Sequence, residues 1–161
     1  MPELLRLEHF GFTYPQQPCP ALADVSLTVR QGEFWVLCGA SGCGKTTLLR
    51  QLKPALRPHG AAEGRILFDG QPLDDLPPHR QAADIGFVLQ SPEEQTVTDK
   101  VWHELAFGLE SLGCDTPSIR RRVAEMASFF GIQDWFHRKV DELSGGQKQL
   151  LALASGMVLQ P

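Results

Sequence analysis

The chain has 161 residues, of which 42% are hydrophobic, and a formal net charge of −4 at pH 7. This length suits one domain with a core of its own. No apolar run approaches the ~18 residues of a membrane span, and no basic block is present, which excludes an integral membrane protein and nucleic-acid binding by bulk charge. The N-terminus has no signal-peptide pattern and the four cysteines form no Cys-x-x-Cys pair, so we expect a cytosolic protein with reduced thiols.

The N-terminal part predicts two strands. Residues 4–10 alternate between apolar and polar, and residues 25–29 form a second short apolar pattern. Between them, residues 11–18 predict a loop that is fixed by prolines and carries Tyr14, the only tyrosine. An aromatic side chain just before a nucleotide site can stack on a base, or it can simply cap the core. The spacing alone leaves both interpretations open.

A glycine-rich motif follows a continuous apolar run. Residues 34–38 predict a strand buried on both faces, and residues 46–52 predict a helix. Between strand and helix the sequence matches the phosphate-loop pattern G-x-x-x-x-G-K-[ST]. The motif consists of Gly39, Ala40, Ser41, Gly42, Cys43, Gly44, Lys45, Thr46 and Thr47. The order strand, loop, helix favours a nucleotide phosphate site over a plain glycine-rich turn.

Each residue type in this motif has a physical reason. Glycines allow positive φ and bring the backbone close to a ligand. The amides of such a loop form an anion nest at a helix N-terminus, where the helix dipole also favours negative charge. Lys45 adds a positive charge for the β- and γ-phosphates, and Thr46 offers a hydroxyl to Mg²⁺.

The middle of the chain predicts further strands and loops. Residues 54–63 predict a loop, residues 64–70 a strand that ends in a tight turn, and residues 71–84 a loop with at most one helical turn. Residues 85–89 predict another buried strand, which runs into Gln90. A polar amide at the end of a buried strand is well placed to touch a ligand, although it can also be an ordinary strand terminator.

The second half predicts helices, over residues 98–112, 116–130 and 150–158. In the second of these, a stripe of apolar residues at helical spacing predicts packing against a core: Ile119, Val123, Met126, Ala127 and Phe130. The third helix follows a second motif, made of Leu143, Ser144, Gly145, Gly146 and Gln147. Ser144 can cap the helix, and the glycine pair leaves amides open to an anion. The alternative is a mere N-cap.

Together these motifs resemble those of ATP-binding cassette (ABC) ATPases. Residues 39–46 resemble the Walker A motif, Gln90 the Q-loop, and residues 143–147 the signature motif, in the family's order. The resemblance implies an α/β P-loop NTPase fold with an N-terminal antiparallel β part and a helical subdomain. It divides the chain into a nucleotide-binding core (1–90), a helical subdomain (91–142) and a signature segment (143–161).

The same resemblance implies the ligands and the residues that hold them. Tyr14 matches the A-loop aromatic of the family, which favours adenine stacking over core capping. ATP is expected to bind Tyr14, residues 39–47 and Gln90, with Mg²⁺ held by Thr46 and Gln90. Residues 143–147 are expected to contact the ATP of a partner subunit. Leu150 stands where many cassettes have arginine after the signature.

A narrower resemblance concerns residues 90–95 and 101–108. They resemble the ATPase subunits of energy-coupling-factor importers, which take up vitamins and transition-metal ions. This implies a second ABC ATPase subunit in a head-to-tail homodimer or heterodimer, a transmembrane partner, and a peripheral location on the inner face of the cell membrane. No nucleic-acid partner is implied.

In this family the Walker B aspartate, the catalytic glutamate and the switch histidine follow the signature helix. None of them is found within the 161 residues, so we expect no catalytic residue here, a sheet that lacks its C-terminal part, and ATP binding without hydrolysis. Three functions compete: an importer ATPase represented by a truncated chain, a non-hydrolysing nucleotide-binding or regulatory module (or a decayed gene product), and another P-loop enzyme such as a small-molecule kinase or a GTPase.

Overall fold

The computed structural model describes residues 1–161, which form two compact units, Met1–Gln81 and Ala82–Pro161. Each unit buries its own set of apolar side chains. The functional division into core, helical subdomain and signature segment stays a prediction. None of the helices combines the length and the apolar character that crossing a membrane requires.

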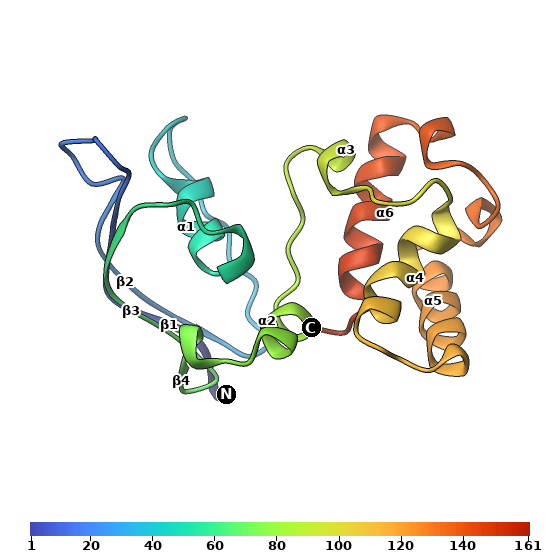
Figure 1. Ribbon diagram of the computed structural model, residues 1–161, viewed down its shortest axis with the longest axis horizontal. Coiled ribbons are helices and arrows are strands. Elements are labelled where there is room, and N and C mark those ends of the chain that lie inside the picture. The colour runs from blue at the N-terminus through green and yellow to red at the C-terminus, as the bar shows by residue number, and fades with distance from the viewer. The chain divides into compact units, whose positions relative to one another are not determined.

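The first unit contains a four-stranded antiparallel sheet in the order β2-β1-β3-β4 (Figure 1). Its strands are β1 (Glu3–Thr13), β2 (Leu22–Arg30), β3 (Ala61–Phe68) and β4 (Gln71–Pro72). Leu7 pairs with Leu27 and Ile66 across the sheet. Side chains alternate between the two faces of a strand, so one face of the sheet is apolar and the other is polar. The predicted N-terminal strands are confirmed, although β1 continues to Thr13 and the loop begins at Tyr14.

The apolar side of this unit is completed by helices. Those that bury apolar side chains are α1 (Lys45–Gln51) and the short 3₁₀ helix η2 (Leu73–Asp75). The 3₁₀ helix η1 (Pro54–Leu56) and α2 (Pro78–Asp84) bury none, and α2 extends past Gln81. The buried side chains of the unit are Leu7, Phe10, Phe12, Leu22, Leu48, Ile66, Phe68, Leu73 and Leu76. The expectation of at most one helical turn within 71–84 is wrong. Pro78 starts α2, because a fixed φ near −65° suits the first position of a helix.

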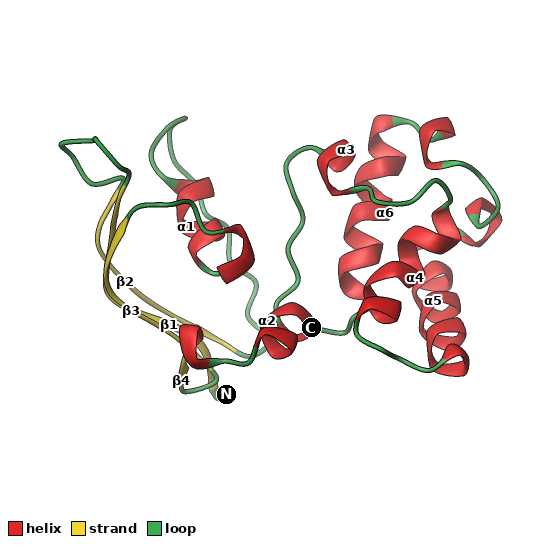
Figure 2. Ribbon diagram, in the orientation of Figure 1, coloured by secondary structure: helices red, strands yellow, loops and turns green.

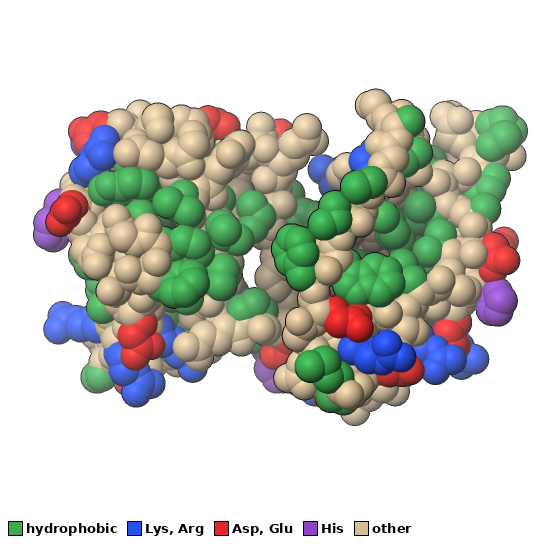
Figure 3. Space-filling model, turned by 180° about the vertical axis from the view of Figure 1, so that it is seen from behind, with side chains coloured by type: hydrophobic (Ala, Val, Ile, Leu, Met, Phe, Trp, Pro, Cys, Tyr) green, Lys and Arg blue, Asp and Glu red, His purple; other side chains and the backbone are tan.

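The two apolar runs expected as buried strands are not strands. Residues 33–40 and 85–89 lie outside every helix and strand (Figure 2). Phe34 is 91% exposed and Val36 71% exposed. A strand in the interior of a sheet is hydrogen-bonded to a neighbouring strand along each of its two edges. No strand of residues 1–161 pairs with either run. Apolar side chains are accordingly visible at the surface (Figure 3).

The second unit is helical, and α4, α5 and α6 pack against one another (Figure 1). Its helices are α3 (Pro92–Gln95), α4 (Val101–Ser111), α5 (Thr116–Phe130) and α6 (Gly145–Met157), with the 3₁₀ helices η3 (Gln133–Trp135) and η4 (Val140–Glu142). The three predicted helices are confirmed. The range of α5 agrees with the prediction, α4 is shorter at both ends, and α6 begins directly after the predicted cap Ser144, ahead of the apolar residues 150–158.

The predicted stripe of α5 is its buried face. Ile119, Val123 and Ala127 are buried in the core of the unit, and Met126 and Phe130 pack against that core. The helix begins where the Asp115 carboxylate accepts the Ser118 amide hydrogen at 3.1 Å. Hydrogen bonding from the side chain and then from the amide of Ser118 lowers the pKa of Asp115. It ends at Gly131, whose φ of 67° suits a glycine C-cap.

The exposed run at residues 34–37 predicts that the 161-residue chain aggregates. The double substitution Phe34→Ser and Val36→Thr should raise the soluble fraction. It should leave the melting temperature nearly unchanged, since both side chains are exposed. Light scattering and thermal denaturation measure the two quantities. A wild-type chain that is already a soluble monomer with a sharp transition would contradict this prediction.

Candidate functional site

The glycine loop lies between the 34–38 run and α1. Gly42 and Gly44 have φ values of 82° and 94°, a region that favours glycine. At Gly44 the backbone also passes very close to another segment, because a Cβ there would lie 2.7 Å from the carbonyl oxygen of Ala21. At Gly42 an added Cβ would meet nothing within 4 Å. Of these two glycines, Gly44 therefore needs glycine for both conformation and space.

The loop leaves backbone amides available where α1 begins. The first helical bond runs from the Leu48 amide to the Gly44 carbonyl oxygen at 2.8 Å, and no side chain caps the helix. The amides of residues 44–47 precede this bond and have no acceptor in the preceding turn. Such amides suit an anion, and the helix dipole adds to the attraction.

Two side chains of the motif add the remaining chemistry. The Lys45 ammonium donates to the carbonyl oxygens of Gly39 at 2.9 Å and Ala40 at 2.7 Å, and lies 3.5 Å from the Cys43 sulfur. It is therefore folded over the loop that would hold the phosphates. The residue Thr46 is exposed in the first turn of α1. Because Mg²⁺ keeps several waters and takes few protein ligands besides phosphates, a single hydroxyl here fits that ion.

Tyr14 lies beside the same helix. Its hydroxyl is 3.0 Å from the Thr47 hydroxyl, and its ring makes an edge contact with Phe12 at 5.0 Å between centroids. The side chain is only half-buried. The structure thus brings Tyr14 to the glycine loop although the two are far apart in sequence, and the partly exposed ring is compatible with base stacking, which stays a prediction.

The second motif forms the start of α6. The Ser144 hydroxyl accepts the Gln147 amide hydrogen at 3.4 Å, and the Gln147 side chain accepts the Ser144 amide hydrogen at 2.9 Å. This is a capping box, so the predicted N-cap is confirmed. Gly145 and Gly146 are exposed, whereas Leu143 is buried in the core of the unit. A role of this helix start toward an anion stays a prediction.

The predicted site residues fall into two groups. Tyr14 and the loop of residues 39–47 belong to the first unit, whereas Gln90 and residues 143–147 belong to the second. Gln90 is exposed and directly precedes the turn into α3. Sequence reasoning assigned no role to Gln95, whose side chain joins two parts of the second unit. Its oxygen accepts the Leu89 amide hydrogen at 2.9 Å, and its nitrogen donates to the Ala152 carbonyl oxygen at 3.4 Å.

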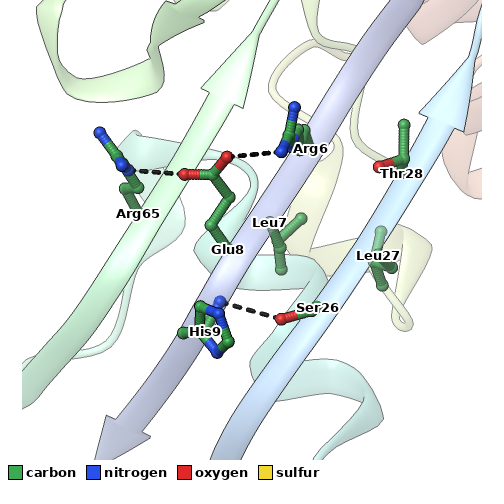
Figure 4. A pocket seen from close by; sticks show the side chains of 8 residues that line it. All are labelled: Arg6, Leu7, Glu8, His9, Ser26, Leu27, Thr28 and Arg65. Atoms are coloured by element: carbon green, nitrogen blue, oxygen red, sulfur yellow. Dashed lines mark hydrogen bonds and ion pairs between the residues drawn. The ribbon is translucent and has the colours of Figure 1, made fainter.

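A pocket of about 500 Å³ lies on the polar face of the sheet, and no residue of these motifs lines it (Figure 4). The Glu8 carboxylate lies between two guanidinium groups, 2.9 Å from Arg6 and 2.6 Å from Arg65. Both guanidinium groups of the pocket are therefore paired with the same carboxylate. No group of three or more His, Cys, Asp or Glu side chains is arranged to hold a metal ion.

Comparisons with known proteins give one consistent result. The family model of the ABC transporter matches residues 22–161. A protein of Bacillus cereus (strain ATCC 10987 / NRS 248) that carries the name of an ABC transporter ATP-binding protein is 46% identical over 155 residues, which is 96% of this chain and 28% of that protein. The energy-coupling factor transporter ATP-binding protein EcfA of Syntrophomonas wolfei subsp. wolfei is 34% identical over 161 residues, which covers 98% of this chain and 57% of that protein.

Among solved structures, cbiO1 from Clostridium perfringens, described as part of the ABC transporter complex cbiONQ, superposes with a TM-score of 0.86. It is 28% identical, and the match covers all of this chain and 63% of cbiO1. The chain therefore spans between about a quarter and just over half of the length of these two curated relatives.

We expect substitutions of Gly42 and Gly44 to lower the stability of the chain by different amounts. Gly42→Ala adds only backbone strain, roughly 1–2 kcal/mol. Gly44→Ala adds the same strain and also forces the Ala21 carbonyl to move, so it should lower the melting temperature further. Thermal denaturation of the two variants beside wild type measures the difference. Equal melting temperatures for both variants would contradict the close approach at Gly44.

Proposed function

The chain belongs to the ABC transporter family, and on this premise we propose that it is the ATP-binding part of an importer ATPase of the energy-coupling-factor type. The relative from Syntrophomonas wolfei and the cbiO1 structure support the importer type. The resemblance of residues 90–95 and 101–108 to such ATPases favours a vitamin or a transition-metal ion as the transported solute. The chain matches only part of the length of each relative. The activity of the whole protein is therefore also a proposal.

The observation that carries the proposal is the arrangement around the start of α1. Open amides, the Lys45 ammonium and the Thr46 hydroxyl lie where the glycine loop passes into the first turn of α1. Tyr14 is hydrogen-bonded to Thr47 in the same turn. In the proposed complex the amides and Lys45 bind the phosphates, and Tyr14 stacks on the adenine. Thr46, with Gln90, holds a Mg²⁺ ion, which neutralises phosphate charge.

The second motif supplies the contact with a partner in this proposal. In the family two ATPase subunits pair head to tail, so residues 143–147 of one chain face the ATP of the other, in a homodimer or a heterodimer. A transmembrane subunit then holds the pair at the inner face of the membrane. The exposed glycine pair and the capped helix start are compatible with this role.

Hydrolysis is proposed for the whole protein and not for residues 1–161 alone. In-line attack on the γ-phosphate needs a metal clamp and a group that orients the water or takes its proton. The residues that supply these functions in the family follow the signature helix. Residues 1–161 are therefore proposed to bind ATP without turning it over.

Lys45 provides the direct test of phosphate binding. Lys45→Ala removes a charge-assisted hydrogen bond worth about 1.5–3 kcal/mol, so the affinity for Mg·ADP should fall roughly tenfold or more. Isothermal titration calorimetry measures it, with Lys100→Ala as a control that loses the same charge at an exposed position in the other unit. Equal affinities for wild type and Lys45→Ala would refute the assignment.

Tyr14 tests the recognition of the base. Tyr14→Ala should weaken ADP binding by about 1–3 kcal/mol and leave pyrophosphate binding unchanged, because only ADP carries a base to stack on. Tyr14→Phe keeps the ring but loses the hydrogen bond to Thr47, so it serves as the matched control. Calorimetry with both ligands gives the comparison. If Tyr14→Ala weakens both ligands equally, Tyr14 supports the loop and does not bind the base.

A further inference from the structure

One face of α6 receives the segment that carries Gln90. We call residues 88–95 the Gln90 segment. It contacts α6 at two successive turns, because Gln95 donates to the carbonyl oxygen of Ala152 and Glu93 lies 3.5 Å from the Lys148 ammonium; one turn further on, the Val88 side chain would be 3.9 Å from a Cβ added at Gly156. Residues 148, 152 and 156 are spaced by four, so they lie on one face of the helix. Figure 1 shows α3 and α6 side by side.

Two features make this contact close. Ala152 is buried, and at Gly156 the Val88 side chain lies at an ordinary van der Waals distance from the position of an added Cβ. Pro92, the first residue of α3, is buried, and Lys148 has a side chain only 18% exposed. The ion pair of Lys148 with the 64% exposed Glu93 contributes little by itself, because exposed pairs are screened by water. The specific polar contact on this face is therefore the Gln95 amide.

The Gln95 side chain uses both ends of its amide. Its oxygen accepts the amide hydrogen of Leu89, the residue directly before Gln90, and its nitrogen donates to Ala152 on α6. One side chain thus ties the backbone next to Gln90 to the helix that starts with Ser144. Neither the short α3 nor the irregular residues 85–89 would provide this link alone.

The far end of the segment is fixed as well. The Glu104 carboxylate, 7% exposed, accepts hydrogen bonds from the Val97 amide at 3.1 Å and from the Thr98 amide and hydroxyl at 2.9 Å each. Glu104 belongs to α4, which packs on α6. The residues that follow the Gln90 segment are therefore held to the helical core.

We propose that Gln95 is a positioning residue that couples Gln90 to the signature helix, so that nucleotide bound near Gln90 changes the helix start at residues 144–147. The coupling rests on the proposed function of Gln90 and of residues 143–147. The bracket that Gln95 forms between Leu89 and Ala152 does not depend on that function. The two parts can therefore be tested in one experiment.

The experiment is hydrogen exchange measured by mass spectrometry on the 161-residue chain, with and without Mg·ATP, for peptides over residues 86–92 and 144–150. Three variants are compared with wild type. Gln95→Ala removes both bonds, whereas Gln95→Glu keeps an acceptor for Leu89 and loses the donor to Ala152. Glu94→Ala changes an exposed residue of the same helix and is the matched control. Melting temperatures show whether each variant remains folded.

Without nucleotide, Gln95→Ala should speed exchange at one amide of the 86–92 peptide roughly fivefold, as expected for the loss of one hydrogen bond. Gln95→Glu and Glu94→Ala should not. With Mg·ATP, the 144–150 peptide of wild type and Glu94→Ala should change its exchange rate. In both Gln95 variants less than half of this change should remain, although calorimetry still detects ATP binding.

The possible results separate the coupling from the proposed function. A full response at residues 144–150 in Gln95→Ala, or no response in a wild-type chain that binds ATP, overturns the coupling. A wild-type chain that binds no ATP overturns both the proposed function and the coupling. In that case the exchange of the 86–92 peptide still decides whether Gln95 forms the bracket, and unchanged exchange in Gln95→Ala shows that it does not.

Discussion

The close approach of Gly44 to the carbonyl oxygen of Ala21 is the contact on which the glycine loop depends. Ala21 precedes β2, and its amide donates to the carbonyl oxygen of Phe12 in β1 at 2.8 Å. The loop is thereby fixed to the connection between the first two strands. Tyr14, which directly follows β1, reaches the same helix start through its hydrogen bond with Thr47. The antiparallel sheet thus determines where the amides of the loop lie, and amides held in place need no costly reorganisation when they bind an anion.

The elements that could be predicted from sequence are those whose own residues show a periodic apolar pattern or a capping residue. The strand β1 alternates along its length, and α5 combines an apolar stripe at helical spacing with a capping aspartate and a terminal glycine. Residues 34–38 and 85–89 also have a clear apolar pattern, yet they are not strands. The pattern shows that these side chains favour burial. It does not show which neighbouring strand would bury them, and a ladder needs that neighbour.

The same distinction holds for the site. The glycine loop and the capped start of α6 follow from a few adjacent residues, and the serine with glutamine three positions later is itself a capping-box pattern. The bond between Tyr14 and Thr47 and the bracket formed by Gln95 join residues far apart in the chain. Neither has a spacing that a periodic pattern can reveal. Gln95 belongs to the stretch 90–95 that carries the narrower resemblance, but the sequence does not reveal what its side chain binds, because its partners are backbone groups that any residue type provides.

The exposed run at residues 34–37 has a consequence for synthesis on the ribosome. The run is made early, and no strand among residues 38–161 pairs with it. At the usual rate of about 5–20 residues per second, translation of residues 38–161 takes on the order of ten seconds. Hydrophobic collapse is complete within microseconds to fractions of a millisecond, so the nascent chain folds its sheet and helices while this run still faces solvent. An extended, uncharged apolar stretch that stays open for seconds is a binding site for the chaperones that accompany translation.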